Sequence, residues 1–94
     1  MTCYQIAEIR CLTLGTEAVC VPVRGLACLV ENNSASGSVY LREQRVDGVS
    51  AGADNGWVLA PGERTPVPLV ALDLSLAASA ADTDARVLIL DPVG

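Results

Sequence analysis

Short β-prone runs closed by turn residues recur along the whole chain, and this pattern constrains the fold more than any other feature of the sequence. The runs follow one another about every eight to twelve residues, a spacing typical of a sandwich or barrel. No internal repeat or linker interrupts them, so residues 1–94 are predicted to form one domain. The predicted strands are 4–14, 18–23, 26–31, 38–45, 57–60, 67–69, 72–81 and 86–90.

The segment 72–81 is the one place where a helix competes, because it contains several alanines. Leu72, Leu74 and Leu76 nevertheless alternate with polar residues at a period of two, which favours a strand. Pro22 and the prolines around residue 67 predict short or edge strands. Between the runs, a turn is predicted at 82–84, and three further turns carry a glycine suited to positive φ: Asp47–Gly48, Asn55–Gly56 and Pro61–Gly62.

Seven or eight short strands without a convincing helix predict an all-β fold. We expect an antiparallel β-sandwich or small barrel, either Ig-like or jelly-roll-like.

The apolar residues are mostly small and aliphatic, with no phenylalanine and only three aromatic residues. A 94-residue chain with such a core often gains stability by oligomerising or docking. The runs 26–31 and 86–90 are apolar on both faces, so either loops or another subunit must cover their outer face. The candidate interface residues are Trp57, Tyr40, Leu88 and Leu90.

Trp57 supports two interpretations. It could be an exposed anchor for a protein partner or a platform for a sugar, since tryptophan is enriched at binding hot spots. It could instead be the one large side chain in an aliphatic core, which is the interpretation we favour from the sequence.

The sequence offers no catalytic, cofactor-binding or metal-binding site. It contains no histidine, which excludes Ser-His-Asp and Cys-His nucleophile systems. Arg10 and Cys11 are neighbours in a predicted strand and should face opposite sides, so the arginine would not activate the thiol. The acidic residues near 54 and 82–84 are too few for calcium, and no phosphate-binding glycine loop is present. We therefore expect no enzyme and no small-molecule substrate.

The net charge of −5 comes from eleven acidic residues against six scattered arginines, with no lysine. Nucleic acids and anionic membranes are bound by clustered basic residues, so neither is an expected partner. No apolar run reaches the length of a membrane span, and the N-terminus carries no secretion signal. We therefore expect synthesis in the cytoplasm.

Cys3, Cys11, Cys20 and Cys28 are spaced eight or nine residues apart, without the close pairs of a zinc site. Two disulfides with three possible connectivities stay open. The favoured interpretation is that these residues are small buried hydrophobes on adjacent strands.

Three motifs between Leu29 and Leu90 carry a resemblance: Val39–Tyr40–Leu41, Asn55–Gly56 with Leu59–Ala60–Pro61–Gly62–Glu63, and Arg86–Val87–Leu88. In this order they resemble small β-sandwich virion proteins of tailed bacteriophages, over about two-thirds of the chain. The cysteine-containing first third has no counterpart in this resemblance.

The resemblance implies a non-enzymatic structural protein of the phage virion, made in the host cytoplasm: a head decoration or minor capsid protein. It implies binding to the major capsid protein and self-association, commonly as a trimer. Two alternatives stay open. One is a component of the head–tail junction, tail or fibre, and the other is a carbohydrate- or peptide-binding adhesion module.

Overall fold

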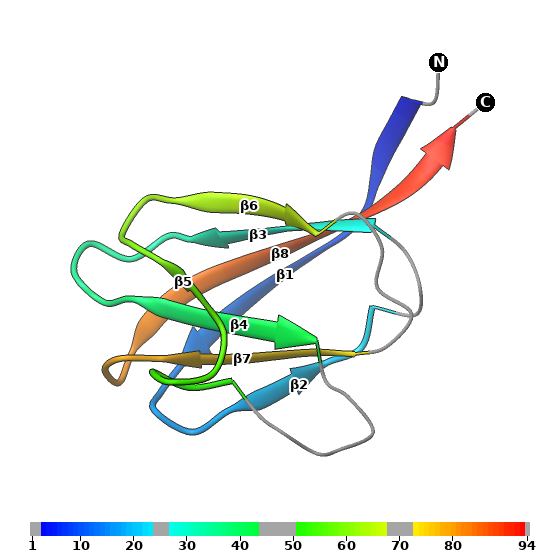
Figure 1. Cartoon of the computed structure of the whole chain (residues 1–94). Coiled ribbons are helices and arrows are strands. Elements are labelled where there is room, and N and C mark those ends of the chain that lie inside the picture. The colour runs from blue at the N-terminus through cyan, green and yellow to red at the C-terminus, as the bar shows by residue number, and fades with distance from the viewer. Residues whose placement is uncertain (1–2, 24–26, 44–50, 68–72, 94) are drawn as a thin grey trace.

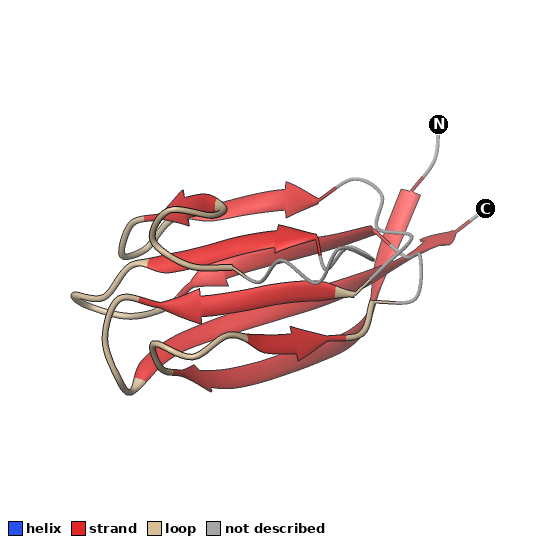
Figure 2. Cartoon of the chain, turned by 60° about the horizontal axis from the view of Figure 1, so that its bottom comes forward, coloured by secondary structure: helices blue, strands red, loops and turns tan. Residues whose placement is uncertain are grey.

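The computed structural model describes residues 3–23, 27–43, 51–67 and 73–93. These residues form strands, turns and loops, and none of them is helical (Figure 2). The strands are β1 (Cys3–Leu14), β2 (Val19–Val21), β3 (Ala27–Asn32), β4 (Val39–Glu43), β5 (Trp57–Leu59), β6 (Arg64–Val67), β7 (Leu74–Ala78) and β8 (Thr83–Val93).

The strands build two four-stranded antiparallel sheets, in the orders β1-β8-β3-β6 and β2-β7-β4-β5. Within these sheets β1 pairs with β8, β2 with β7, β3 with β6, and β4 with β5. The chain therefore folds back on itself as four nested strand pairs that wrap into two layers (Figure 1). This is the eight-stranded jelly roll. The prediction of an all-β sandwich is confirmed, and the jelly-roll form of it is the one adopted.

The core lies between the two sheets and follows the two-residue alternation of the strands. In β3 the side chains of Cys28 and Val30 are buried while Ala27 and Leu29 face outward and are half-buried. The buried apolar cluster contains no aromatic residue among the described part of the chain: Leu14, Val21, Val23, Cys28, Val30, Val39, Leu41, Leu59, Leu74, Leu76, Ala78, Ala85, Val87 and Ile89. Each large aliphatic side chain buried here stabilises the fold by about 1.5–3 kcal/mol.

Two predicted glycine turns are confirmed. Gly62 has φ +82°, and the Glu63 backbone N–H donates to the Ala60 carbonyl at 3.0 Å, as expected for a type II turn. Gly56 has φ +142°, and a Cβ added there would lie 2.7 Å from the Leu41 carbonyl oxygen. This close approach requires glycine. The predicted turn at 47–48 lies outside the described residues.

Several predicted strands differ from those observed at their ends, and β6, β7 and β8 differ most. The strand predicted at 72–81 ends at Ala78 as β7, because residues 79–82 form the turn that follows it. β8 begins at Thr83, because the turn falls earlier, with Asp82 at φ 58° and the Thr83 hydroxyl donating to the Ala80 carbonyl at 2.8 Å. The predicted turn at 82–84 is therefore wrong in its last two residues. β6 spans Arg64–Val67 instead of 67–69. It can contain Pro66 because it is an edge strand, where a residue without a backbone N–H need not break a hydrogen bond to a neighbouring strand. Residues 68 and 69 lie outside the described part.

β1 and β8 are the two longest strands and pair over almost their whole length. Their far ends, near the two termini, continue beyond the sandwich as a two-stranded arm (Figure 1). The register of the pair shifts between Ile6 and Glu8, which places a β-bulge at Ala7, inside the sheet and close to the point where the arm begins.

Candidate binding surfaces

The outer face of the β1-β8-β3-β6 sheet carries a row of apolar side chains across all four strands. Each member lies directly opposite the next: Ile9 opposite Leu88, Leu88 opposite Leu29, and Leu29 opposite Pro66. We call these four residues the apolar row. A second line of Ile6, Leu90 and Ala27 runs beside it, in the same register across three strands. Ile6 and Ile9 are 53% and 54% exposed, so this face is open to solvent along β1, whereas its central leucines are half-buried.

A charged line borders the apolar row on the side away from the termini. Glu31 lies opposite Arg86 in one neighbouring strand and opposite Arg64 in the other. Apolar residues with a polar margin are the arrangement found at protein interfaces, where the rim stays wet and the centre is dry.

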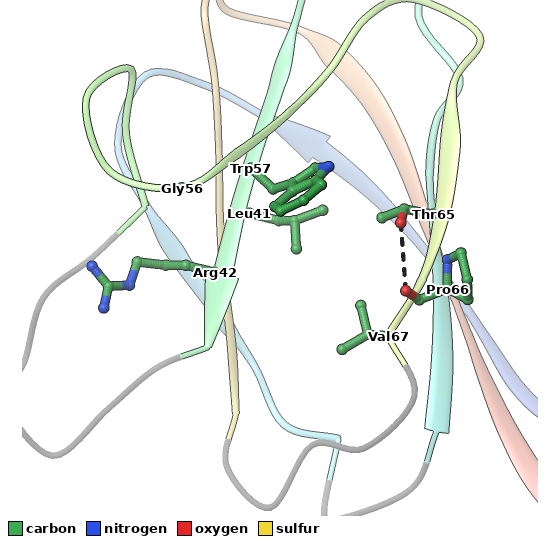
Figure 3. Close-up of a pocket in the computed structure, with 7 residues that line it drawn as sticks. All are labelled: Leu41, Arg42, Gly56, Trp57, Thr65, Pro66 and Val67. Atoms are coloured by element: carbon green, nitrogen blue, oxygen red, sulfur yellow. Dashed lines mark hydrogen bonds between the residues drawn. The ribbon is translucent and has the colours of Figure 1, made fainter.

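The second candidate surface is a cleft of about 380 Å³ at the side of the sandwich where the edge strands β5 and β6 face each other. The Trp57 indole lies over Leu41 and faces Thr65 and Val67 of β6, while Arg42 points away from it (Figure 3). Pro66 lines this cleft and also ends the apolar row, although its ring points away from Trp57 (Figure 3).

Trp57 is 69% exposed, so the prediction that it fills the core is wrong. The physical reason is its position in a three-residue edge strand. Leu59 of the same strand fills the core at 3% exposure, and Trp57, two residues earlier, overhangs the open side between the sheets.

The four predicted interface residues fall in three places. Leu88 and Leu90 lie on one face of β8, where the apolar row and the line beside it run. Trp57 lies in the cleft. Tyr40 is half-buried and lies opposite Val58 on the outer face of the other sheet, so the structure does not bring it to Trp57.

The outer face of the other sheet is partly covered by its own chain. Ser75 and Ala77 of β7 point outward yet are only 1% exposed. The backbone N–H of Ala51 donates to the Ser75 hydroxyl at 2.9 Å, so the segment around Ala51 lies over this face. Within the described chain, nothing equivalent lies over Ile9.

Asn32, the last residue of β3, is a buried anchor with 0% exposure. Its amide donates to the carbonyls of Gly37 at 2.7 Å and Leu59 at 2.9 Å. Its side-chain oxygen accepts from the Ser34 N–H and hydroxyl at 3.0 and 2.6 Å. Asn32 therefore ties β3 to β5 and holds the strand that carries Trp57. The only feature of the sequence that could have indicated this role is that Asn32, a polar residue, falls at an inward-facing position of the β3 alternation.

The cysteines only partly follow their prediction. Cys28 is buried, but Cys11 and Cys20 are exposed, so the prediction of buried cysteines is wrong for these two. All three are free thiols, and the Cys3 side chain lies outside the described part. Burial raises the pKa of Cys28 to about 11, and desolvation together with a hydrogen bond to Asp73 raises the pKa of Cys20. Raised pKa values disfavour the thiolate that a cysteine nucleophile needs.

Among the described residues, no three metal-ligating side chains gather at one place. Nor does any helix in that part of the chain have the length and apolarity to cross a membrane. No protein-family model and no curated protein matches this sequence.

Proposed function

We propose that this protein is a non-enzymatic structural component of a bacteriophage virion. In this proposal it is a head decoration or minor capsid protein that binds the major capsid protein and stabilises the head. The observation that carries the proposal is the apolar row on the outer face of the β1-β8-β3-β6 sheet, in which Ile9 and Pro66 are exposed and Leu29 and Leu88 are half-buried. Exposed apolar residues gathered on one sheet face are typical of a contact with another protein, which supports the proposal.

Three further points support the same role. The motifs around Tyr40, Gly62 and Val87 resemble those of phage virion proteins. Jelly rolls recur in viral capsids, although they also occur in lectins and cupins, so the fold alone is an analogy. The acidic net charge of −5 favours a protein partner over packaged DNA.

The test is co-sedimentation of the purified protein with heads of its phage that lack it. We expect saturable binding to the heads and a higher temperature of head disruption. Leu88→Glu and Leu29→Glu place a charge in the centre of the apolar row and should abolish binding. Val58→Glu is the matched control, because Val58 is an exposed apolar residue on the opposite sheet.

The proposal is wrong if the wild-type protein does not bind the heads, or if Leu88→Glu binds as well as Val58→Glu. Circular dichroism of each variant checks that the fold is intact. Binding to tails or to the head–tail junction instead of heads would move the protein to that part of the virion.

A second candidate function rests on the Trp57 cleft. An exposed indole beside a shallow apolar cleft is a stacking platform for a sugar ring or an apolar peptide side chain. Titration with glycans, followed by Trp57 fluorescence, tests this adhesion role. A change in emission that saturates, together with glycan binding that calorimetry detects for the wild type and not for Trp57→Ala, would favour it over the capsid role.

A further inference from the structure

We propose that two copies of this protein pair through the edge of β1 that has no neighbouring strand among the described residues, antiparallel about a two-fold axis at Ile9, and so join their β1-β8-β3-β6 sheets into one eight-stranded sheet. The inference deepens the self-association that is part of the proposed function and rests on it in that respect. It specifies the partner surface and the symmetry.

The four edge strands of the sandwich are not equivalent. β2 and β5 have three residues each, and β6 has four and contains Pro66. Short edges and prolines are the usual means of preventing strand addition. β1 has twelve residues and no proline. Gln5, Ile6, Ala7, Glu8 and Ile9 are all exposed, on both faces of the strand.

The charges on β1 identify the occupant of this edge as a second copy. Glu8 and Arg10 share one face and flank Ile9. In an antiparallel pair centred on Ile9, Glu8 of each copy lies opposite Arg10 of the other, which gives two attractive pairs. Centring the pair on Glu8 or on Arg10 would instead place like charges opposite each other, which is unfavourable. The sequence Glu-Ile-Arg is therefore complementary to itself in one register.

The contact between Arg10 and Glu8 within one chain is weak enough for each side chain to pair with the second copy instead. Within one chain, the Arg10 Nε lies 3.3 Å from the Glu8 carboxylate, yet this buried nitrogen makes no hydrogen bond of good geometry. Residues two apart on a strand are separated by about 6.8 Å along it. Side chains directly opposite on paired strands start only about 4.5–5.5 Å apart at Cβ, so the second copy offers the better-placed partner.

Pairing about Ile9 has a consequence for the apolar row. A two-fold axis perpendicular to the sheet keeps the outer faces of both copies on the same side. The two rows would then meet at Ile9 and form one apolar stripe of eight residues across both copies. The bulge at Ala7 interrupts the regular ladder close to the axis, so the pair is expected to be weak, with a dissociation constant in the micromolar range or above.

Sedimentation velocity of the isolated protein, from low micromolar to millimolar concentration, tests the pairing without any capsid. The wild type should show a monomer–dimer equilibrium. Glu8→Arg and Arg10→Glu each replace two attractive pairs with two repulsive ones and should raise the dissociation constant at least about tenfold. The double variant that carries both substitutions restores attraction and should dimerise again. A mixture of the two single variants should form mixed dimers.

Two matched controls change the charge of exposed residues away from β1. Glu17→Arg and Arg64→Glu alter the net charge in the same way and should leave the dimer unchanged. A wild type that stays monomeric at all concentrations would overturn the inference. It would show that the charges of Glu8 and Arg10 only prevent other strands from pairing with β1. A dimer that survives both single reversals, or a double variant that stays monomeric, would also overturn it.

These outcomes are distinct from those of the proposed function. A monomer that binds phage heads overturns the pairing and leaves the capsid role intact. A dimer that does not bind phage heads overturns the capsid role and leaves the pairing intact.

Discussion

Replacing Asn32 with alanine tests whether one buried amide holds the cleft side of the sandwich together. The Asn32 side chain makes four hydrogen bonds, two donated to Gly37 and Leu59 and two accepted from Ser34. After the replacement, the single Ser34 hydroxyl proton no longer goes to the Asn32 side chain and can be donated to the Gly37 carbonyl, 2.9 Å away. The Leu59 carbonyl, in a residue that is 3% exposed, loses the amide donor.

The expected loss of stability can be worked out from these contacts. Each hydrogen bond contributes about 0.5–1.5 kcal/mol net, and a buried group left without a partner costs about 1–3 kcal/mol. The partial recovery at Gly37 lowers the sum, so we expect Asn32→Ala to reduce the free energy of unfolding by about 3–5 kcal/mol. A domain of this size is stable by roughly 5–14 kcal/mol in total. The melting temperature should fall by roughly 12–40 °C.

Urea and thermal unfolding followed by far-UV circular dichroism measure this change. Asn33→Ala is the matched control, because the Asn33 amide donates only to the exposed Asp84 carboxylate at 2.8 Å. In that variant the free energy of unfolding should fall by less than about 1 kcal/mol. If Asn32→Ala were as stable as Asn33→Ala, Asn32 would not be the anchor of β5, and our account of how the cleft is held would be wrong.

Three further predictions concern the turn at Gly56, the buried thiol and the exposed indole. Gly56→Ala should lower the free energy of unfolding, measured with urea, by about 1–3 kcal/mol, because the new Cβ would approach the Leu41 carbonyl. Gly62→Ala is the control and should lower it by less, because the space around Gly62 is open. Burial raises the folded pKa of Cys28 from 9.0 to about 11, so stability should be unaffected below about pH 9 and fall by up to about 1.4 kcal/mol per pH unit between pH 9 and 11. Cys28→Ala should remove that part of the alkaline loss, and an unchanged slope would contradict the assignment. Trp57 should emit like indole in water and be readily quenched by acrylamide, while Trp57→Ala should change stability by less than about 1 kcal/mol; a shielded, blue-shifted emission would contradict its position in the cleft.

The local features of the fold could be predicted because they depend on neighbours in the sequence. Alternation at a period of two indicated most of the strands, and it also favoured the correct structure for the segment that includes β7, where alanines suggested a helix. Gly56 and Gly62 marked turns because few other residues adopt positive φ at low cost. Boundaries were less certain, as at Thr83, whose place in the ladder depends on pairing with the distant Leu14.

The candidate surfaces could be predicted only in part. Leu88 and Leu90 were predicted as candidate interface residues because their run is apolar on both faces, and in the structure they lie on the outer face of β8. The same pattern could not reveal whether such a face is covered. Ser75 also faces outward but is buried by the segment around Ala51, while Ile9 stays exposed. Whether an outward-facing side chain is covered depends on a segment more than twenty residues away in the sequence, and the alternation within one strand does not predict where that segment lies.

The sequence by itself determined that this protein is an all-β chain with short strands, glycine turns and an aliphatic core, because these follow from side-chain type and spacing. Only the tertiary structure decided the nesting of strand pairs into a jelly roll and the exposure of Trp57. It also decided the burial of Asn32 and the position of β1 at an edge of its sheet. Each of these depends on which distant strands become neighbours, and therefore on contacts between residues that no local pattern connects.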